Sequence, residues 1–367
     1  MSKRVAFSVS LVLFAMVLAA CEASPQPSAD TSGEPSGSLA EGTPIPTAAP
    51  PPAGGTLAQV LDRGQLICGI NGNLPGFSFL DSATSETSGF DADFCRAVAA
   101  AVLGDPDLVE FRPLNADARG PALQSREVDV LIRNTTWTVS RDTDWGLFAP
   151  TTFYDGQGMM VRAADGISSL ADLDGATICV QTGTTTELNL TDVLGSEGID
   201  FTPLPFGEIE QTYSAYDEGS CDAVTSDRSQ LIAQRTTLAN PDDHILLEEV
   251  MSKEPLGPVV PMGDDAWFNI VKWVVFATFE AEERGITQAN VADMVNSDNL
   301  VIARLLGAEG DKGLGLDADW VVNVISAVGN YAEIYERNLG ASTPFDLDRG
   351  PNSLWTDGGL LYAPPYR

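Results

Sequence analysis

Residues 172–190 read DLDGATICVQTGTTTELNL and hold one strand, one turn and the start of one helix. The apolar run at 177–180 predicts the strand, and the pattern from 184 to 194 predicts the helix. Gly183 lies in the turn between them, where the free backbone N–H groups of a helix amino terminus suit a carboxylate. A structural alternative also fits, because Thr184 and Glu187 have the Ser/Thr-x-x-Asp/Glu spacing of a capping box. The stretch therefore predicts an α/β unit whose turn either binds a ligand or simply caps a helix.

Predicted strands and helices also alternate on both sides of this stretch. Further strands are predicted at 66–70, 108–111, 128–132, 199–202 and 223–225, and further helices at 57–63, 91–103, 122–126 and 208–217. Thr56 is the expected cap of the first of these helices, and Gly64 is its expected stop. Strands separated by helical segments of about ten residues indicate parallel sheets with crossover helices, which is the α/β class. After Trp267 a long helical pattern takes over, and the Gly-, Pro- and aromatic-rich end of the chain predicts an irregular wrap.

The body of the chain is large enough for two lobes. Residues 56–367 are near the upper limit for one hydrophobic core. Four cysteines lie there, and they allow three pairings: Cys68, Cys95, Cys179 and Cys221. If the body has two lobes, proximity in sequence favours Cys68 with Cys95 and Cys179 with Cys221, one disulfide in each lobe. Four buried thiols are the alternative.

The amino-terminal residues have the order of a secretory signal. Lys3 and Arg4 precede an uncharged apolar run at 5–20, and Cys21 follows two alanines. Leu-Ala-Ala-Cys at 18–21 resembles the bacterial lipoprotein signal, in which Cys21 becomes the lipidated first residue of the mature protein. The alternative is an ordinary signal peptide with an incidental cysteine. We therefore expect a signal peptide at 1–20 and, at 21–55, a Pro-, Ser- and Thr-rich tether that cannot bury enough surface to fold; a mere propeptide fits this segment less well.

The charge is lopsided, since 52 Asp and Glu residues outnumber 20 Lys and Arg residues and give a formal net charge of -32. Such a field repels phosphate backbones, so nucleic acid is not an expected partner. An anionic ligand would need a local cationic pocket. His244 is the only histidine, and neither CxxC nor HExxH occurs, so we expect no metal and no cofactor.

Two further segments place a charged residue near the end of a predicted strand, one as a loop after the strand and one as a strand that ends in an acid. Residues 134–141, NTTWTVSR, end in Arg141, whose guanidinium could hold a carboxylate at the carboxyl edge of a sheet. Residues 221–227, CDAVTSD, end in Asp227, which could pair with an ammonium group. The structural alternatives are a surface arginine and a helix N-cap. Together the three loops supply an arginine, a helix amino terminus and an aspartate, which suit a zwitterionic α-amino acid.

Other arginines show a pattern that we treat as chance. They recur every seven residues, at 112, 119, 126 and 133, but Pro113 and Pro121 break any continuous helix between them.

Several long strings resemble the amino-acid-binding receptors of bacterial ABC importers, and more closely the general L-amino-acid-binding subgroup. They are GFDADFCRAVAAAVLGDPD (89–107), NTTWTVSRDT (134–143), the opening stretch at 172–190, SKEPLGPVV (252–260) and LWTDGGLLYAPPYR (354–367). The resemblance covers residues 56–367. It implies a two-lobed type II periplasmic-binding-protein fold, in which each lobe is a mostly parallel sheet with flanking helices and two hinge strands join the lobes. The implied division is lobe 1 at 56–158, lobe 2 at 159–254, and a return to lobe 1 with a carboxyl-terminal extension at 255–367.

The resemblance also implies a ligand for particular residues of this sequence. Arg141 matches the arginine that binds the ligand carboxylate, and Asp227 matches the acid that receives the ammonium group. The other matched positions are Thr136, Thr184 and Thr185 as carboxylate contacts, and Leu74 and Phe77 in a loop near the ligand where an aromatic side chain often covers it. Leu74 departs from that pattern because it is not aromatic, and Gly120 stands where a large apolar residue is expected.

The resemblance implies a receptor that captures L-α-amino acids of broad specificity and passes them to ABC transporter permease subunits, without catalysis, and we expect a monomer. The lipoprotein signal and the tether depart from the freely soluble periplasmic form of the family, so we expect this receptor to be lipid-anchored. The main alternative is a periplasmic enzyme on the same fold, such as a dehydratase of a cyclic dicarboxylate, which needs a general acid or base in the cleft. Glu187 is the nearest candidate, and a capping role explains it better. A sensor module is a second alternative, which the sequence after residue 56 does not favour because it has no membrane span or kinase segment.

Overall fold

The computed structural model describes residues 49–50, 52–310 and 313–367. The predicted signal peptide at 1–20, Cys21 and most of the predicted tether lie outside the described residues. Among the described residues, no helix combines the length and the apolar character that crossing a bilayer requires.

The first sheet joins strands from distant parts of the sequence in the order β5-β1-β6-β15-β7. Its strands are β1 (Leu66–Ile70), β5 (Val109–Pro113), β6 (Val130–Leu131), β7 (Gly146–Phe148) and β15 (Val259–Pro261). The pairs of β1 with β5 and with β6 are parallel, whereas β15 runs antiparallel to β6 and β7. A small sheet of β2 (Asn73–Leu74), β3 (Ser78–Leu80) and β4 (Thr87–Ser88) follows β1 along the chain.

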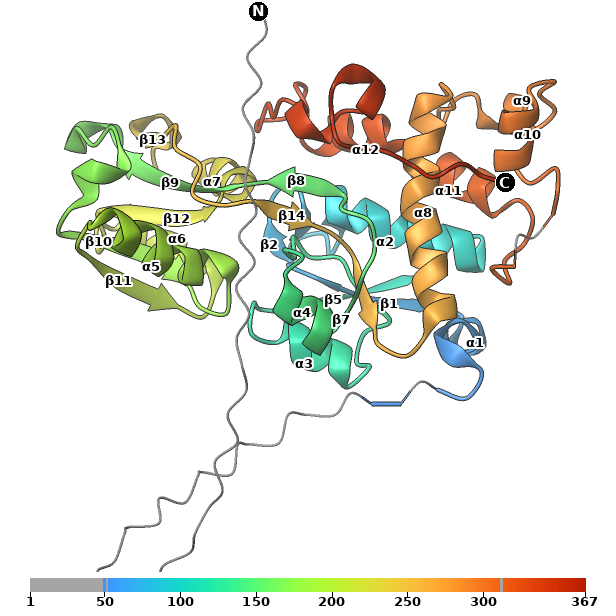
Figure 1. Ribbon diagram of the computed structural model, residues 1–367, viewed down its shortest axis with the longest axis horizontal. Coiled ribbons are helices and arrows are strands. Elements are labelled where there is room, and N and C mark those ends of the chain that lie inside the picture. The colour runs from blue at the N-terminus through green and yellow to red at the C-terminus, as the bar shows by residue number, and fades with distance from the viewer. Residues whose placement is uncertain (1–48, 51, 311–312) are drawn as a thin grey trace, which may run out of the picture. The chain divides into compact units, whose positions relative to one another are not determined.

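The second sheet is built from one continuous part of the chain, in the order β11-β10-β12-β9-β13 (Figure 1). Its strands are β9 (Gln157–Arg162), β10 (Ala176–Gln181), β11 (Phe201–Phe206), β12 (Ala223–Asp227) and β13 (His244–Leu246). The strand β10 is parallel to β11 and β12, and β9 is antiparallel to β12 and β13. The predicted α/β class and its parallel pairs are confirmed, with antiparallel strands added to each sheet.

Two short strands carry the chain between the sheets. The strands β8 (Phe153–Asp155) and β14 (Glu254–Leu256) pair antiparallel, and Figure 1 shows both in the middle of the molecule, between the two five-stranded sheets. Glu254 lies opposite Asp155 in this pair.

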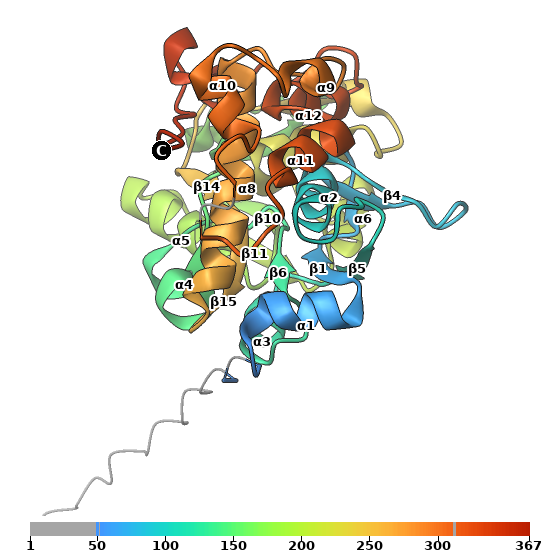
Figure 2. The ribbon, with the colours of Figure 1, turned by 90° about the vertical axis from the view of Figure 1, so that its right-hand side faces the viewer.

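Most of the helices pack with the first sheet. They are α1 (Gly55–Arg63), α2 (Phe90–Leu103), α3 (Arg119–Gln124), α4 (Val139–Asp144), α8 (Asp265–Glu283), α9 (Val291–Met294), α10 (Leu300–Leu305), α11 (Trp320–Val328) and α12 (Tyr331–Asn338). The helix α2 packs against α8 and α11 (Figure 2). Its apolar residues recur at helical spacing, and Gly104 ends it in the left-handed conformation that glycine adopts readily.

The second sheet carries α5 (Thr185–Glu197), α6 (Ile209–Asp217) and α7 (Arg228–Arg235). The described residues also form short 3-10 turns, which are η1 (Ala163–Asp165), η2 (Leu170–Leu173), η3 (Pro241–Asp243) and, near the carboxyl terminus, η5 (Trp355–Asp357).

The carboxyl-terminal residues form the predicted irregular wrap, which includes a further 3-10 turn, η4 (Gly350–Asn352). Asn352 is buried beside β8: its Nδ2 donates to the carbonyl of Tyr154 at 3.1 Å, and its Oδ1 accepts from the N–H of Tyr154 at 2.6 Å. The wrap therefore satisfies backbone groups on one of the two crossing strands.

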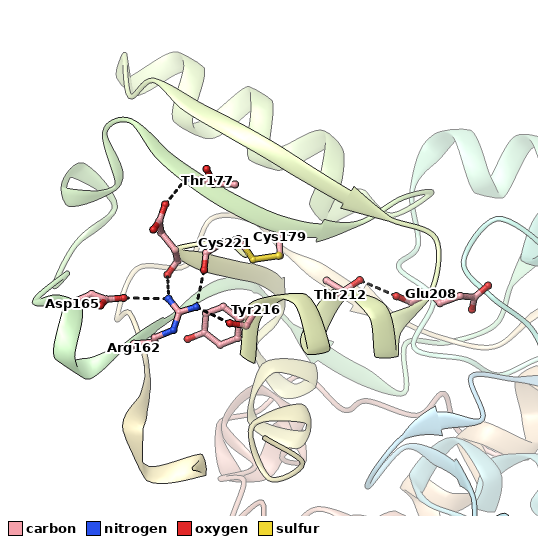
Figure 3. The surroundings of a disulfide bond; sticks show 9 residues. Arg162, Asp165, Thr177, Cys179, Glu208, Thr212, Tyr216 and Cys221 are labelled. Carbon is pink, nitrogen blue, oxygen red and sulfur yellow. Dashed lines mark hydrogen bonds and ion pairs between the residues drawn. A yellow bond between two sulfur atoms is a disulfide. The ribbon is translucent and has the colours of Figure 1, made fainter. Parts of the chain in front are cut away.

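Two disulfides are present, with the pairing that sequence proximity favours. Cys68 is bonded to Cys95, and Cys179 to Cys221. Figure 3 shows the second bond beside Arg162, whose Nη2 donates to the carbonyls of Tyr216 and Cys221 at 2.6 and 2.8 Å. The bond ties β10 to the turn that precedes β12.

The predicted cap of the first helix is wrong. The helix α1 begins at Gly55, after Gly54, so that Thr56 lies inside its first turn. The backbone N–H of Thr56 donates instead to Oδ2 of Asp264, at the start of α8, 2.6 Å away. The carboxylate of Asp264, far along the chain, thus accepts from a backbone N–H at the start of α1, where a local cap was expected.

Candidate functional site

The loop after β6 places Arg141 beside Thr136. Thr138 caps α4, since its hydroxyl accepts from the N–H of Arg141 at 3.2 Å. The short helix turns the arginine back over the loop, where its Nη1 donates to the carbonyl of Thr136 at 3.0 Å. Both residues are buried. Arg141 is therefore not the surface arginine of the structural alternative.

The turn after β10 serves as a helix cap and also faces the loop after β6. The Thr184 hydroxyl accepts from the N–H of Glu187 at 3.1 Å, which confirms the predicted cap. The Glu187 carboxylate does not reach back to Thr184 and instead accepts from the N–H of Gly183 at 3.0 Å. The Thr185 hydroxyl donates to the carboxylate of Glu254 at 2.8 Å and lies 3.3 Å from the hydroxyl of Thr136.

Gly183 is required at its position by a close approach between the two sheets. Its φ is 71°, and a Cβ there would lie 1.9 Å from Oδ1 of Asp117, in the loop after β5. The carbonyl of Gly183 accepts from Nη2 of Arg119 at 2.9 Å. A side chain at this position would have to displace the carboxylate of Asp117, and the positive φ is one that glycine adopts readily.

Asp227 ends β12 and stands at the N-cap position of α7, but its side chain makes no capping hydrogen bond. Its carboxylate accepts from Nδ2 of Asn134, across the gap between the sheets, at 3.4 Å. Burial raises the pKa of this carboxyl well above its usual range, and the neighbouring carboxylates of Asp155 and Glu254 raise it further. The N-cap alternative accounts for the position of Asp227 but not for the direction of its side chain.

A single cavity collects the residues of all three loops. Its volume is about 20 Å³, enough for a water molecule but not for an amino acid, so a larger ligand enters only if the walls move apart. Of the predicted contacts, Thr136, Arg141, Thr184, Thr185 and Asp227 line it. The remaining lining residues are Arg119, Arg133, Asn134, Gln181, Thr186, Ser226 and Gln230.

Two of these lining residues belong to the series of arginines that we had attributed to chance. Arg119 is the first residue of α3, and Arg133 directly follows the predicted strand at 128–132. The rule that placed Arg141 at the carboxyl edge of the sheet applies equally to Arg133, so this residue could have been found from the sequence. Arg119 could not, because only the packing of α3 on the sheet brings it to the cavity.

All three guanidinium groups are buried, and burial lowers the pKa of each. The pKa of Arg133 falls to about 10 through burial and the nearby charge of Arg141, with Asp91 acting in the opposite direction. The pKa of Arg119 falls well below its usual range through burial and then through the charges of Arg141 and Arg133. Arginines nevertheless stay charged at neutral pH. The cavity is therefore a local cationic pocket in an acidic protein.

Leu74 and Phe77 lie elsewhere in this structure. Both are fully buried, and neither lines the cavity. The ring of Phe77 packs edge to face against Phe90 and Phe153, with centroids 6.0 and 5.2 Å apart. Contact of either residue with a ligand stays a prediction.

The described residues contain no group of three or more His, Cys, Asp or Glu side chains placed to hold a metal ion. The only carboxylate that lines the described part of the cavity is that of Asp227. The arrangement can bind charged groups through paired ions and hydrogen bonds, whereas Glu187, the candidate general acid, is committed to the backbone of Gly183.

Comparison with known proteins gives consistent matches over the body of the chain. Residues 66–341 match the model of the bacterial extracellular solute-binding proteins, family 3. The chain is 52% identical over 317 residues to the general L-amino acid-binding periplasmic protein of Rhizobium johnstonii, covering 85% of this chain and 93% of that protein. It is 51% identical over 316 residues to the glutamate/glutamine/aspartate/asparagine-binding protein of Rhodobacter capsulatus, covering 85% and 93%.

A solved structure is similar over the same part. An ABC transporter periplasmic binding protein from Brucella ovis with glutathione bound has 53% sequence identity and a TM-score of 0.83, and the match covers 85% of this chain and 99% of that chain. The relatives described here are named as binding proteins, and none of them is named as an enzyme.

Proposed function

The chain belongs to the bacterial extracellular solute-binding proteins, family 3, and on that premise we propose that it captures L-α-amino acids in the cavity between its two sheets and delivers them to the permease of an ABC importer. The observation that carries the proposal is the cavity itself, because Arg141 and Asp227 line it together. A carboxylate fits the guanidinium and the hydroxyls of Thr184 and Thr185, while an ammonium group fits Asp227.

The names of the relatives favour transport over the enzymatic alternative. They describe binding of amino acids in general, of four acidic and amide amino acids, and of glutathione, so a broad range of ligands fits the family. A dehydratase would need an acid or base in the cavity, and Glu187 is engaged as a cap partner. The carboxyl that does line the cavity is that of Asp227, to which we assign the ligand ammonium.

Calorimetric titration with L-leucine tests the assignment of the two charged residues. Arg141→Gln and Asp227→Asn should each weaken binding by at least about tenfold, because each leaves a buried charge of the ligand without its partner. The matched control is Arg112→Gln, whose guanidinium is only partly buried and pairs with Glu110 and Glu127 outside the cavity. Affinities within about twofold of the wild-type protein in both site variants would rule out this assignment.

We infer that the two crossing strands β8 and β14 act as a hinge between a first lobe (56–158 and 255–367) and a second lobe (159–254). The narrow cavity supports this, since ligand entry requires its walls to separate. A radius of gyration, measured by small-angle X-ray scattering, should fall when a saturating amino acid is added. An unchanged radius would count against the hinge.

We further propose an extracytoplasmic protein that is monomeric and anchored by lipid on Cys21, with 21–55 as its tether. The Leu-Ala-Ala-Cys sequence at 18–21 supports the anchor. The wild-type protein, expressed in a bacterial host supplied with a labelled fatty acid, should incorporate the label, and Cys21→Ser should not. A wild-type protein without label would contradict the anchor.

A further inference from the structure

The helix α7 begins next to the acid that faces the cavity, yet that acid does not cap it. Asp227 is the N-cap residue of α7, and its ψ of 137° is not helical, but its side chain accepts no hydrogen bond from the helix. Aspartate at an N-cap normally accepts from the N–H of the second or third helical residue, here Ser229 or Gln230. The free N–H groups of α7 therefore need another acceptor.

Asp155, on the crossing strand β8, supplies that acceptor. Its Oδ2 accepts from the N–H of Ser229 at 3.3 Å and also from the hydroxyl of Ser229. Its Oδ1 accepts from the N–H of Gly156 at 2.8 Å. The carbonyl of Gly156 in turn accepts from the N–H of Arg228, the first residue of α7, at 2.8 Å. A carboxylate from the crossing strand thus takes the role that the N-cap side chain would otherwise have.

The carboxylates around the start of α7 have separate partners. Glu254 lies opposite Asp155 on the crossing strand β14, and its Oε2 accepts from the hydroxyl of Thr185 at 2.8 Å. Asp227 lines the cavity and accepts from Nδ2 of Asn134 at 3.4 Å, whereas Asp155 does not line the cavity. Of the three acids, Asp227 alone faces the ligand, and it can do so because α7 already has an acceptor.

We propose that Asp155 is a positioning residue for ligand capture: it caps α7 from the crossing strand and so keeps the carboxylate of Asp227 turned into the cavity. The inference rests on the proposed function, because it concerns the acid that receives the ligand ammonium. Without Asp155, the side chain of Asp227 would be the local acceptor for the N–H of Ser229, which is the ordinary arrangement at an N-cap. Its carboxylate would then turn away from the cavity.

The same arrangement places a second negative charge beside Asp227. Burial raises the pKa of Asp155 to about 6, and the charge of Glu254 contributes, whereas the hydrogen bonds from Ser229 and Gly156 act in the opposite direction. Burial also raises the pKa of Asp227 well above its usual range, and the charge of Asp155 is the next cause. Asp155 therefore helps the ligand by orienting Asp227, and it opposes the ligand at low pH by favouring the protonated form of Asp227.

Other titratable side chains also act on these two carboxyls. They are the same in the wild-type protein and in a variant of Asp155, so the difference between the two proteins isolates the effect of Asp155. Within the described residues, they come from α3, the loop after β6, α4, β14, α6 and α12, and are Arg119, Arg133, Arg141, Glu254, Tyr213 and Tyr335. Asp155 also lines a separate groove, whose further charged residues include Arg228, Lys253, Asp348 and Arg349.

Calorimetric titration with L-leucine at pH 8 compares two variants of Asp155. Asp155→Asn keeps a side-chain oxygen that can accept from Ser229, so its affinity should stay within about threefold of the wild type. Asp155→Ala removes the acceptor and should weaken binding by about tenfold, because Asp227 then becomes the cap. The matched control is Asp172→Ala, which removes a carboxylate that accepts from the N–H of Ser169, outside the cavity. Asparagine and alanine variants that bind alike would overturn the proposal.

The pH profile gives a second readout, which a purely structural residue would not change. Asp155→Asn removes a charge that raises the pKa of Asp227, so its loss of L-leucine affinity on acidification should begin at a lower pH than in the wild type. The same profile in both proteins would show that the charge of Asp155 does not act on Asp227, and would overturn the proposal.

The crystal structure of ligand-free Asp155→Ala tests the positioning role without any binding measurement. The carboxylate of Asp227 should lie within hydrogen-bond distance of the N–H of Ser229. A carboxylate still directed at Asn134 would overturn the proposal while leaving the proposed function intact. A wild-type protein that bound none of the twenty L-amino acids would instead refute the proposed function, and the ligand-free structure would still decide where Asp155 holds Asp227.

Discussion

The indole of Trp145 occupies the space that a side chain on residue 120 would need, beside the arginines of the cavity. A Cβ on Gly120 would lie 2.7 Å from the indole Nε1 of Trp145 and 2.8 Å from its Cε2. The same indole lies under the guanidinium groups of Arg119 and Arg141, at 5.4 and 4.8 Å from the ring centroid. The large apolar residue expected at position 120 is thus replaced by bulk from Trp145, which also supports two cations through its π face.

This arrangement predicts that Gly120→Phe destabilises the fold by about 1–3 kcal/mol, because the new ring must displace the indole in a packed interior. The double variant Gly120→Phe with Trp145→Leu should recover most of that loss. Urea unfolding measures both, with Gly195→Phe as control, since a Cβ at Gly195 meets no atom within 4 Å. A Gly120→Phe protein as stable as the wild type would mean that the two residues do not compete for space.

The raised pKa of Asp227 predicts a pH-dependent affinity. The ligand ammonium requires the ionised carboxylate, whereas burial and the charges of Asp155 and Glu254 favour its protonated form. Protons therefore compete with the ligand, and affinity should fall as the pH is lowered from 8 towards the ordinary carboxyl range near 4.

L-leucine is the suitable ligand for this measurement, because it has no side chain that titrates. Its dissociation constant, measured by calorimetry between pH 5 and 8, should rise at the acid end in the wild-type protein. In Asp227→Asn the affinity should be weak and nearly independent of pH. A flat profile in the wild-type protein would show that Asp227 does not receive the ammonium group.

At the scale of elements, local sequence signals predicted most of the parallel core. The strand at 66–70 agrees with β1 residue for residue, and the helix predicted at 91–103 agrees with α2 within one residue. Local sequence signals did not predict the antiparallel strands β7, β8, β13, β14 and β15, because each has only three residues and is defined by partners far along the chain. The two hinge strands followed only from the family resemblance. Arg119 was missed for the same reason. Strand pairing and the packing of α3 bring it to the cavity, and the opposite wall of the cavity is formed by residues beyond 180.

The disulfide between Cys179 and Cys221 encloses α5, β11 and α6 in a loop with a sequence separation of 42. Replacing both cysteines by alanine should lower the free energy of unfolding by roughly 2–4 kcal/mol, because the unfolded chain regains the freedom that the cross-link removes. Neither cysteine lines the cavity, so the affinity for an amino acid should change little in the folded protein. Denaturant unfolding and calorimetry measure the two effects.

The matched comparison is the double alanine variant of Cys68 and Cys95, whose bond closes a shorter loop in the first sheet. It should also be destabilised, and to a somewhat smaller extent in the chain-entropy description. An unfolding free energy within about 0.5 kcal/mol of the wild type for the Cys179 and Cys221 variant would contradict a stabilising role.

At the scale of the whole molecule, the fold brings charged groups from three parts of the chain to one place. The loop after β6, the turn after β10 and the end of β12 are separated by tens of residues, yet they line one cavity. Each loop taken alone has a structural explanation as a cap or a surface residue. Their convergence, together with the match to the solute-binding family, is what supports capture of a zwitterion.

The most direct test of that claim is the melting temperature of the purified protein, alone and with each of the twenty L-amino acids and a cyclic dicarboxylate. A ligand at one hundred times its dissociation constant stabilises the fold by about 2.7 kcal/mol, which corresponds to a shift of a few degrees. We predict shifts with several L-amino acids. No shift with any amino acid, or a shift with the cyclic dicarboxylate alone, would contradict capture of amino acids.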